Sequence, residues 1–161
     1  MNIRFKNYLD GLTPAKKNLA MEAVKEYLAG ESESVQSLVN PMAVYELCKD
    51  LSLEDEEHSV VLLCNNNLNL IKKLDMCKGT QTETLFDIRA IIREALLAKA
   101  TAIYLVHNHP SGSLRPSRFD DDLTRDVRKA CEYMRLKFID HVIICNGTYY
   151  SYGEQGRLQI T

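Results

Sequence analysis

The sequence of 161 residues contains no run of about eighteen apolar residues that could span a membrane. Residues 1–12 include no apolar segment of signal-peptide length. Basic residues are not in excess either, because 20 lysines and arginines stand against 22 aspartates and glutamates, for a formal net charge of −2. Domains that mainly bind phosphate backbones are usually basic. These absences predict a soluble cytoplasmic protein without a membrane partner, and they argue against nucleic-acid binding as its main role.

The cysteines lack the spacing of a disulfide framework or of a cysteine-ligated zinc site. They are odd in number, form no C-x-x-C motif, and most lie inside apolar segments. They are Cys48, Cys64, Cys77, Cys131 and Cys145. This pattern favours reduced, buried thiols. The H-x-E and P-C-x-x-C motifs of zinc-dependent base deaminases are also absent, which excludes that class of zinc enzyme.

The chain divides into a short helical part and a longer domain. Thr13 is a good N-cap, Pro14 suits the first helical position, and Gly30 suits the residue past the end of a helix. The Glu- and Ser-rich residues 30–34 that follow indicate a linker. We therefore predict an N-terminal helical extension and linker at residues 1–35 and a second domain at residues 36–161.

The pattern of the second domain predicts a mixed β-sheet with hairpins, flanked by helices. Short apolar runs rich in β-forming residues predict five strands, and turns rich in asparagine join the first two and the last two as hairpins. These strands span residues 59–64, 68–76, 101–107, 138–145 and 148–152. Apolar residues at helical spacing predict helices that begin after the caps Asn40, Asp87 and Ser117. Strands that alternate with helices in this way are typical of an α/β domain.

Two of the four histidines stand one residue apart, in His107-Asn108-His109, where the third predicted strand ends. Residues i and i+2 of a strand point to the same side, so both imidazoles can face one point. Asp120 follows with ten residues between it and His109, at the start of the next predicted helix. Three protein ligands with an open fourth position are typical of catalytic zinc. One zinc ion per chain is therefore predicted at His107, His109 and Asp120.

A hydrolytic zinc site also needs a base that takes a proton from the bound water and gives it to the leaving amine. The residue pattern leaves four glutamates open as candidates, namely Glu56, Glu57, Glu83 and Glu94. Glu57 directly precedes the first core strand. Its carboxylate is therefore placed to lie at the mouth of that strand, near the metal.

Ser117 has two compatible interpretations. With Asp120 three residues later it forms the S-x-x-D pattern of a capping box at the start of a long helix. Its hydroxyl is also a candidate donor to a developing oxyanion, a contact whose loss typically costs about 2.7–4 kcal/mol of transition-state stabilisation.

Five further residues surround these candidates. Asn108 is expected to point away from the metal by strand alternation and to hold a loop. His141 is interpreted as a structural residue or one that supports a ligand, and Asp140 as a candidate partner for the far nitrogen of a metal-bound imidazole. Arg115 and Arg118 flank the site, either as binders of a substrate carboxylate or as ordinary solvated charges.

Four segments together resemble the RadC-type branch of the JAB/MPN (JAMM) metalloprotease superfamily. They are His107-Asn108-His109-Pro110-Ser111-Gly112, Pro116-Ser117-x-x-Asp120, Asp140-His141-Val142-Ile143-Ile144 and Tyr150-Ser151-Tyr152. The resemblance covers roughly residues 40–156. It implies a three-layer fold similar to that of cytidine deaminases and a zinc ion held by His107, His109 and Asp120. It also implies a glutamate that holds the bound water, for which it favours Glu57, and an oxyanion-stabilising serine, which maps onto Ser117.

The resemblance implies a zinc-dependent metallopeptidase or isopeptidase, in which metal-bound water attacks an amide carbonyl of a peptide or protein. Two alternatives are a DNA-repair-associated accessory protein with little peptidase activity and a non-catalytic metal-binding scaffold. Many family members carry an N-terminal helix-hairpin-helix module, whereas residues 1–40 offer one helix and no hairpin signature. DNA binding therefore lacks support from this part of the chain.

The exposed strand edge near Tyr149-Tyr150 offers a surface for a homodimer.

Overall fold

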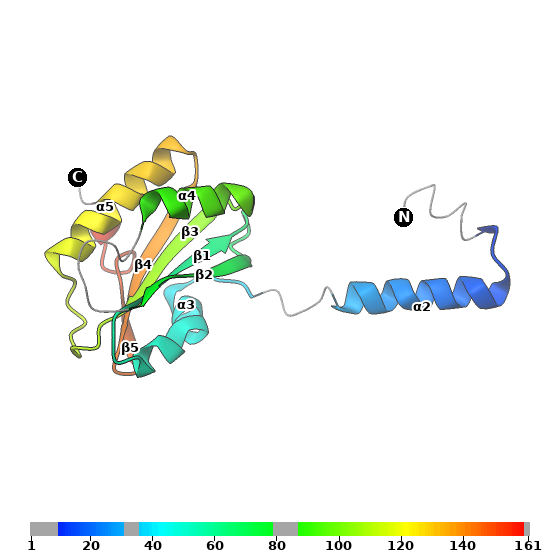
Figure 1. Cartoon of the computed structure of the whole chain (residues 1–161), viewed down its shortest axis with the longest axis horizontal. Helices are drawn as coiled ribbons and strands as arrows, with labels where there is room; N and C mark the ends of the chain where they lie inside the picture. Colours follow the sequence, from blue (N-terminus) through cyan, green and yellow to red (C-terminus); the bar gives the residue numbers. More distant parts are fainter. Residues whose placement is uncertain (1–9, 31–35, 79–86, 160–161) are drawn as a thin grey trace. The chain divides into compact units, whose positions relative to one another are not determined.

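The computed structural model describes residues 10–30, 36–78 and 87–159 (Figure 1). Contacts between Cα atoms divide the chain into residues 1–35 and residues 36–161. The first unit contains helix α2 (Pro14–Gly30), over the residues predicted to be helical. The apolar residues Ala15, Leu19 and Ala23 of this helix are exposed. These three side chains therefore do not stabilise α2 by packing against other residues of the first unit.

The second unit is built on a five-stranded mixed sheet. Its strands are β1 (His58–Cys64), β2 (Leu70–Lys78), β3 (Ala102–Asn108), β4 (Lys137–Cys145) and β5 (Thr148–Ser151). Their order is β2-β1-β3-β4-β5. Strands β3 and β4 are parallel, and the other neighbours are antiparallel. The predicted α/β class and the two predicted hairpins are confirmed.

Three described helices of this unit begin at the predicted caps, namely α3 (Pro41–Cys48), α4 (Ile88–Leu97) and α5 (Arg118–Tyr133). The unit also contains the 3-10 helices η1 (Lys49–Leu53) and η2 (Arg157–Gln159). The Asn40 side chain accepts a hydrogen bond from Ala43 N, and Asp87 accepts from Arg89 N. Ser117 forms a capping box with Asp120. These side chains satisfy backbone donors that a helix N-terminus leaves free.

The sheet separates two apolar cores, and this gives the three layers visible in Figure 1. Helix α3 and η1 cover one face, where Val60, Leu62 and Val106 are buried. Helices α4 and α5 cover the other face, where Ile103 and Leu105 are buried. All seven residues of β3 are buried, as expected for a central strand covered on both faces.

The apolar residues of α4 face the sheet only in part. Ile91 and Ala95 are buried against the sheet, whereas Leu96 is 50% exposed. Leu96 stands at the end of the helix, where the chain turns away through Ala98. Helical spacing alone does not distinguish the last apolar residue of a stripe from an exposed one.

Four of the cysteines, Cys48, Cys64, Cys131 and Cys145, are free and buried in the described structure. Burial raises the pKa of Cys48 to about 12 and that of Cys131 to about 11. These thiols therefore stay protonated at neutral pH and act as small apolar side chains.

Across the described residues, every helix is too short or too polar to cross a lipid bilayer.

Candidate metal site

The alternation of β3 assigns its last residues to opposite faces of the sheet. His107 follows Ile103 and Leu105 on the face covered by α5, whereas Asn108 follows Val106 on the face covered by α3. Asp120 lies in the first turn of α5 and is 3% exposed. The crossover from β3 to α5 therefore brings Asp120 back to the strand end that carries His107.

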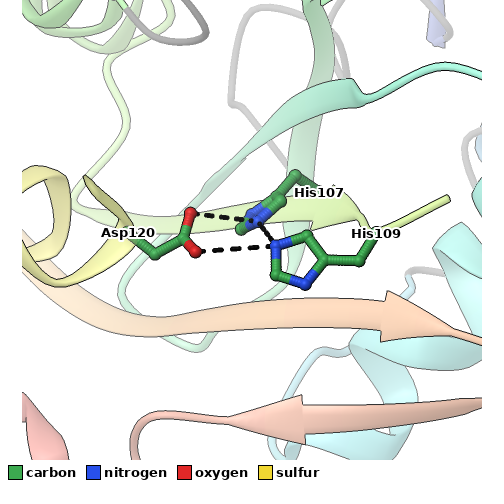
Figure 2. Close-up of side chains that lie close together, drawn as sticks. All are labelled: His107, His109 and Asp120. Carbon is green, nitrogen blue, oxygen red and sulfur yellow. Dashed lines mark hydrogen bonds and ion pairs between the residues drawn. The ribbon is translucent and has the colours of Figure 1, made fainter. Parts of the chain in front are cut away.

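His109 lies one residue beyond the end of β3 and not within it. Its backbone N still donates to Ile144 O at 3.0 Å, which extends the parallel hydrogen-bonding pattern with β4 past the end of the strand. The imidazole of His109 consequently lies beside that of His107 (Figure 2). His107 and His109 therefore face the same point, as their i, i+2 spacing predicts, although His109 lies outside the strand.

Three candidate ligand side chains converge in this arrangement. The two Nε2 atoms of His107 and His109 are 3.0 Å apart, His107 Nε2 is 3.2 Å from Asp120 Oδ1, and His109 Nε2 is 3.5 Å from Asp120 Oδ2 (Figure 2). Zinc bonds of about 2.0–2.1 Å at tetrahedral angles separate neighbouring ligand atoms by about 3.3–3.4 Å. The side chains thus fit a metal ion at a shared point, and this buried group could bind one.

The electrostatics of the group are those of a buried carboxylate between imidazoles. Burial by itself raises the pKa of Asp120, but the imidazoles of His107 and His109 beside the carboxylate and a hydrogen bond from Ser117 outweigh it and hold the pKa well below its usual range. Hydrogen bonding to Asp120 raises the pKa of His109, and the charge of Glu57 adds to this. Asp120 is therefore ionised at neutral pH and offers a negative ligand.

The far nitrogen of His109 has a partner that fixes its proton. His109 Nδ1 lies 2.7 Å from the backbone O of Ser113, and a carbonyl can only accept. The proton of a neutral His109 is therefore on Nδ1, and the lone pair of Nε2 points to the shared site. A backbone carbonyl in this place is a common support for a metal-binding histidine.

The far nitrogen of His107 is held by His141 and not by Asp140. His107 Nδ1 is 2.9 Å from His141 Nε2. Asp140 lies on the other face of β4, where it accepts hydrogen bonds from Ser151 Oγ, His141 N and Gly153 N. Neighbouring residues of a strand point to opposite faces, so only one of the pair can reach His107. The interpretation of His141 as a supporting residue agrees with this geometry, and the interpretation of Asp140 as the partner is wrong.

His141 is fully buried and stacks on Tyr152, with ring centroids 5.1 Å apart and an interplanar angle of 9°. Burial lowers the pKa of His141 far below its usual range, and the charge of His107 lowers it further. His141 is therefore neutral at physiological pH. A neutral ring has one donor and one acceptor nitrogen, so its two contacts are not interchangeable.

Ser117 contacts the carboxylate of Asp120 directly. Its backbone N and its Oγ each donate to Asp120 Oδ2 at 2.7 Å, and the same Oγ accepts from Asp120 N at 3.2 Å. Both halves of the predicted capping box are therefore present. These bonds also orient the carboxylate with Oδ1 toward His107. The oxyanion role of Ser117 stays a prediction.

Asn108 anchors the segment that carries Glu57. Its Oδ1 accepts from His58 N at 2.6 Å, and its Nδ2 donates to the backbone O of Glu54 and of Glu56 at 3.3 and 3.0 Å. Glu57, half-buried between these anchored residues, lies near enough for its charge to raise the pKa of His109. Ser59 of β1 pairs with His107 of β3, so Glu57 precedes β1 at the same edge of the sheet as the two histidines, at the predicted mouth of the strand.

The other glutamate candidates are placed differently. Glu56 is exposed, and Glu94 lies on α4, where it pairs with Lys72 at 3.1 Å and with Arg93 at 3.3 Å. Glu83 lies outside the described residues. Of Glu56, Glu57 and Glu94, Glu57 contributes to the raised pKa of His109.

The two arginines that flank the site lie at the surface. Arg118 begins α5, and its side chain is 96% exposed, 4.0 Å from Asp122. Arg115 is exposed, and its backbone N donates to Ser113 Oγ. A substrate-binding role for either residue stays a prediction.

Two contributors to the site are missing from the sequence-based prediction. Thr124 Oγ1 lies 2.7 Å from His141 Nδ1, and the carbonyl of Ser113 holds His109. Thr124 stands four residues after Asp120 and hence on the same face of α5. That spacing is the one signal in the sequence that points to Thr124.

A cavity of about 170 Å³ adjoins His109. Its lining comes from the end of η1, the strand end of β3 and the β4–β5 turn, and it includes the side chains or backbone of Glu54, Asp55, Asn108, Pro110 and Asn146. A hollow of this size beside a candidate ligand leaves room for part of a bound molecule.

Substitution of Asn108 by alanine is expected to lower the free energy of unfolding by about 2–4 kcal/mol, because three backbone groups lose a buried partner. Urea unfolding followed by circular dichroism measures this change. Asn67 is exposed in a turn, so Asn67→Ala is the matched control with an expected change below about 0.5 kcal/mol. Equal stability losses in the two variants would contradict the anchoring role.

An α/β domain in which the central strand ends at two histidines and the next helix supplies an aspartate is a JAB-type domain with a candidate metal site. A RadC-like JAB domain profile matches residues 38–157. The match covers most of the chain, which therefore belongs to the RadC-like JAB domain family.

Bacterial relatives are similar over most of the chain. A UPF0758 protein of Actinobacillus succinogenes is 40% identical over 136 residues, which are 83% of this chain and 61% of the relative. A UPF0758 protein of Haemophilus ducreyi is 36% identical over 135 residues, which are 83% of this chain and 60% of the relative. A UPF0758 protein of Streptococcus gordonii is 41% identical over 107 residues, which are 66% of this chain and 47% of the relative. The chain thus spans about half to three-fifths of the length of these relatives.

Proposed function

We propose that this chain is a zinc-dependent hydrolase that cleaves an amide or isopeptide bond in a peptide or protein. The observation that supports this most directly is the convergence of His107 Nε2, His109 Nε2 and the Asp120 carboxylate at separations of 3.0–3.5 Å. A zinc ion held by these side chains would polarise a substrate carbonyl and lower the pKa of a bound water to about 7.

The residues around the ligands supply the proton transfers that hydrolysis requires. Glu57 is assigned as the base, which accepts a proton from the attacking water and delivers it to the nitrogen of the leaving amine as the C–N bond breaks. Its place before β1, at the edge of the sheet where β3 ends in the two histidines and on a segment held by Asn108, supports this assignment. Ser117 is assigned to the oxyanion, because its hydroxyl lies at the ligand carboxylate. The single hydroxyl proton, which Ser117 donates to Asp120 Oδ2 in this structure, would turn to the oxyanion in this role.

The cavity beside His109 is the proposed place for part of the substrate. Glu54 and Asp55 are among its lining residues, together with Leu53, which is 84% exposed. A peptide segment with an apolar and a basic side chain would find an apolar and two acidic residues in this lining. The bond that is cleaved lies at the ligand group in this proposal.

Metal analysis of the protein tests the proposal first. The untagged chain, purified without chelator, is expected to contain about one zinc per chain by plasma mass spectrometry, as for a three-ligand site. Two histidines and a carboxylate also suit iron(II), so iron in place of zinc would argue for oxygenase chemistry. A chain that takes up neither metal after incubation with a stoichiometric amount would refute the proposal.

Cleavage is tested with the zinc-loaded protein on internally quenched peptides and on peptides that carry an isopeptide bond to a lysine side chain. Hydrolysis is expected to stop when the zinc is removed with a chelator and to return when zinc is added back. Mass spectrometry of the products identifies the bond. Cleavage that persists at the same rate in the metal-free chain would exclude a role of the metal.

A further inference from the structure

Three successive hydrogen bonds connect two of the ligands through residues that are not ligands themselves. His107 Nδ1 lies 2.9 Å from His141 Nε2, His141 Nδ1 lies 2.7 Å from Thr124 Oγ1, and Thr124 Oγ1 lies 2.6 Å from the backbone O of Asp120. All four residues are at most 3% exposed. We refer to these three bonds as the His141–Thr124 relay. It crosses from β3 to β4 and from β4 to α5.

The last bond of the relay fixes the direction of the other two. The backbone O of Asp120 can only accept, so the single hydroxyl proton of Thr124 is donated to it. Thr124 Oγ1 must then accept from His141 Nδ1, which places the proton of the neutral His141 ring on Nδ1. His141 Nε2 is left as an acceptor, and His107 Nδ1 donates to it.

The direction of these hydrogen bonds determines which nitrogen of His107 is free to bind a metal ion. A neutral His107 with its proton on Nδ1 has the lone pair of Nε2 directed at His109 and Asp120. The opposite tautomer would place an N–H where a cation has to bind. The carbonyl of Ser113 fixes the same tautomer of His109 by a direct hydrogen bond. The tautomer of His107 is instead fixed indirectly, through the side chains of His141 and Thr124.

We propose that Thr124 and His141 are positioning residues that hold His107 in the tautomer required for metal binding and thereby set the affinity of the site for zinc. The inference rests on the metal site of the proposed function, but not on hydrolysis. Stacking on Tyr152 holds the plane of the His141 ring, so its two nitrogens stay directed at His107 and Thr124. Because Thr124 and His141 are buried, a lost hydroxyl leaves His141 Nδ1 without this acceptor.

Two substitutions of Thr124 separate the hydroxyl from the shape of the side chain. Thr124→Val keeps the volume and removes the hydroxyl, and it is expected to weaken zinc binding about 10- to 100-fold, as loss of a ligand's supporting partner typically does. Thr124→Ser keeps the hydroxyl and is expected to bind zinc within about threefold of the original chain. Competition with a chromophoric chelator measures both dissociation constants.

A control on the same helix face tests for a merely structural effect. Val127 is buried one turn further along α5 and lies outside the relay. Val127→Ala is expected to lower the thermal unfolding temperature while zinc affinity stays within about threefold. If Val127→Ala weakens zinc binding as much as Thr124→Val does, the effect comes from loosening of the helix and the proposal fails.

Nitrogen-15 NMR of histidine-labelled, zinc-loaded protein reads the tautomer directly. His141 is expected to show a protonated Nδ1 and an unprotonated Nε2 in the original chain and in Thr124→Ser. A proton on His141 Nε2 would overturn the inference even if Thr124→Val does not fold. A chain that binds no zinc would overturn this inference and the proposed function together, whereas equal affinity in Thr124→Val and Thr124→Ser would overturn only the inference.

Discussion

Replacement of His109 by alanine is expected to weaken zinc binding by more than about 100-fold, beyond the range typical for loss of a supporting partner. His109 supplies one of the three converging ligand atoms, and its Nδ1 is already committed to the carbonyl of Ser113. The side chain lies just past the end of β3 and belongs to neither apolar core, so its removal leaves both cores intact. Loss of metal affinity can therefore be separated from loss of folding.

Thermal unfolding provides a second measurement of the same loss. A ligand at about 100 times its dissociation constant stabilises the folded state by about 2.7 kcal/mol. Zinc at that concentration is expected to raise the unfolding temperature of the original chain and to leave that of His109→Ala unchanged. The unfolding temperatures of the two metal-free proteins are expected to be similar.

His58 offers a matched control, because it is a histidine outside the ligand group. Its Nε2 lies 3.3 Å from Asp75 of β2. His58→Ala is expected to keep the zinc affinity of the original chain. Unchanged affinity in His109→Ala, or an equal loss in His58→Ala, would show that the three converging atoms are not where zinc binds.

Local sequence patterns are sufficient to predict where the side chains of the candidate ligand group lie in the secondary structure. The apolar run of residues 102–106 marks a strand, and its period of two separates His107 from Asn108. The S-x-x-D pattern marks the first turn of α5 and so places Asp120 at the start of the following helix. Each of these signals lies within a few residues of the side chain it positions. The positions of these candidate ligands at element ends are therefore predictable without knowledge of the tertiary contacts.

The partners of the ligands depend on longer-range geometry. Strand β4 is apolar on both faces, so its sequence does not show whether Asp140 or His141 faces α5. That assignment requires the parallel register with β3, in which Leu105 lies opposite His141. Thr124 reaches His141 only because α5 packs across β4, and the carbonyl of Ser113 carries no side-chain signal at all. These contacts follow from packing and not from any local pattern.

Substitution of Glu57 by glutamine is expected to reduce hydrolysis about 10²- to 10⁴-fold while zinc content and stability stay unchanged. Glutamine keeps the size of the side chain and removes the group that accepts a proton. Glu57 contributes charge next to His109 but none of the three ligand atoms of the group. The variant therefore separates proton transfer from metal binding, which His109→Ala cannot do. Initial rates on the best cleaved peptide, measured at equal zinc occupancy, give the comparison.

Glu56 and Glu94 provide controls of the same chemical type. Glu56 is the exposed neighbour of Glu57, and Glu94 is engaged with Lys72 on the surface of α4. Glutamine at either position is expected to leave the rate within about threefold, because a general base has to reach the reacting water. If Glu56→Gln abolishes cleavage and Glu57→Gln does not, the neighbouring residue is the base. The zinc site would then stand, but the segment held by Asn108 would serve to present Glu56 and not Glu57.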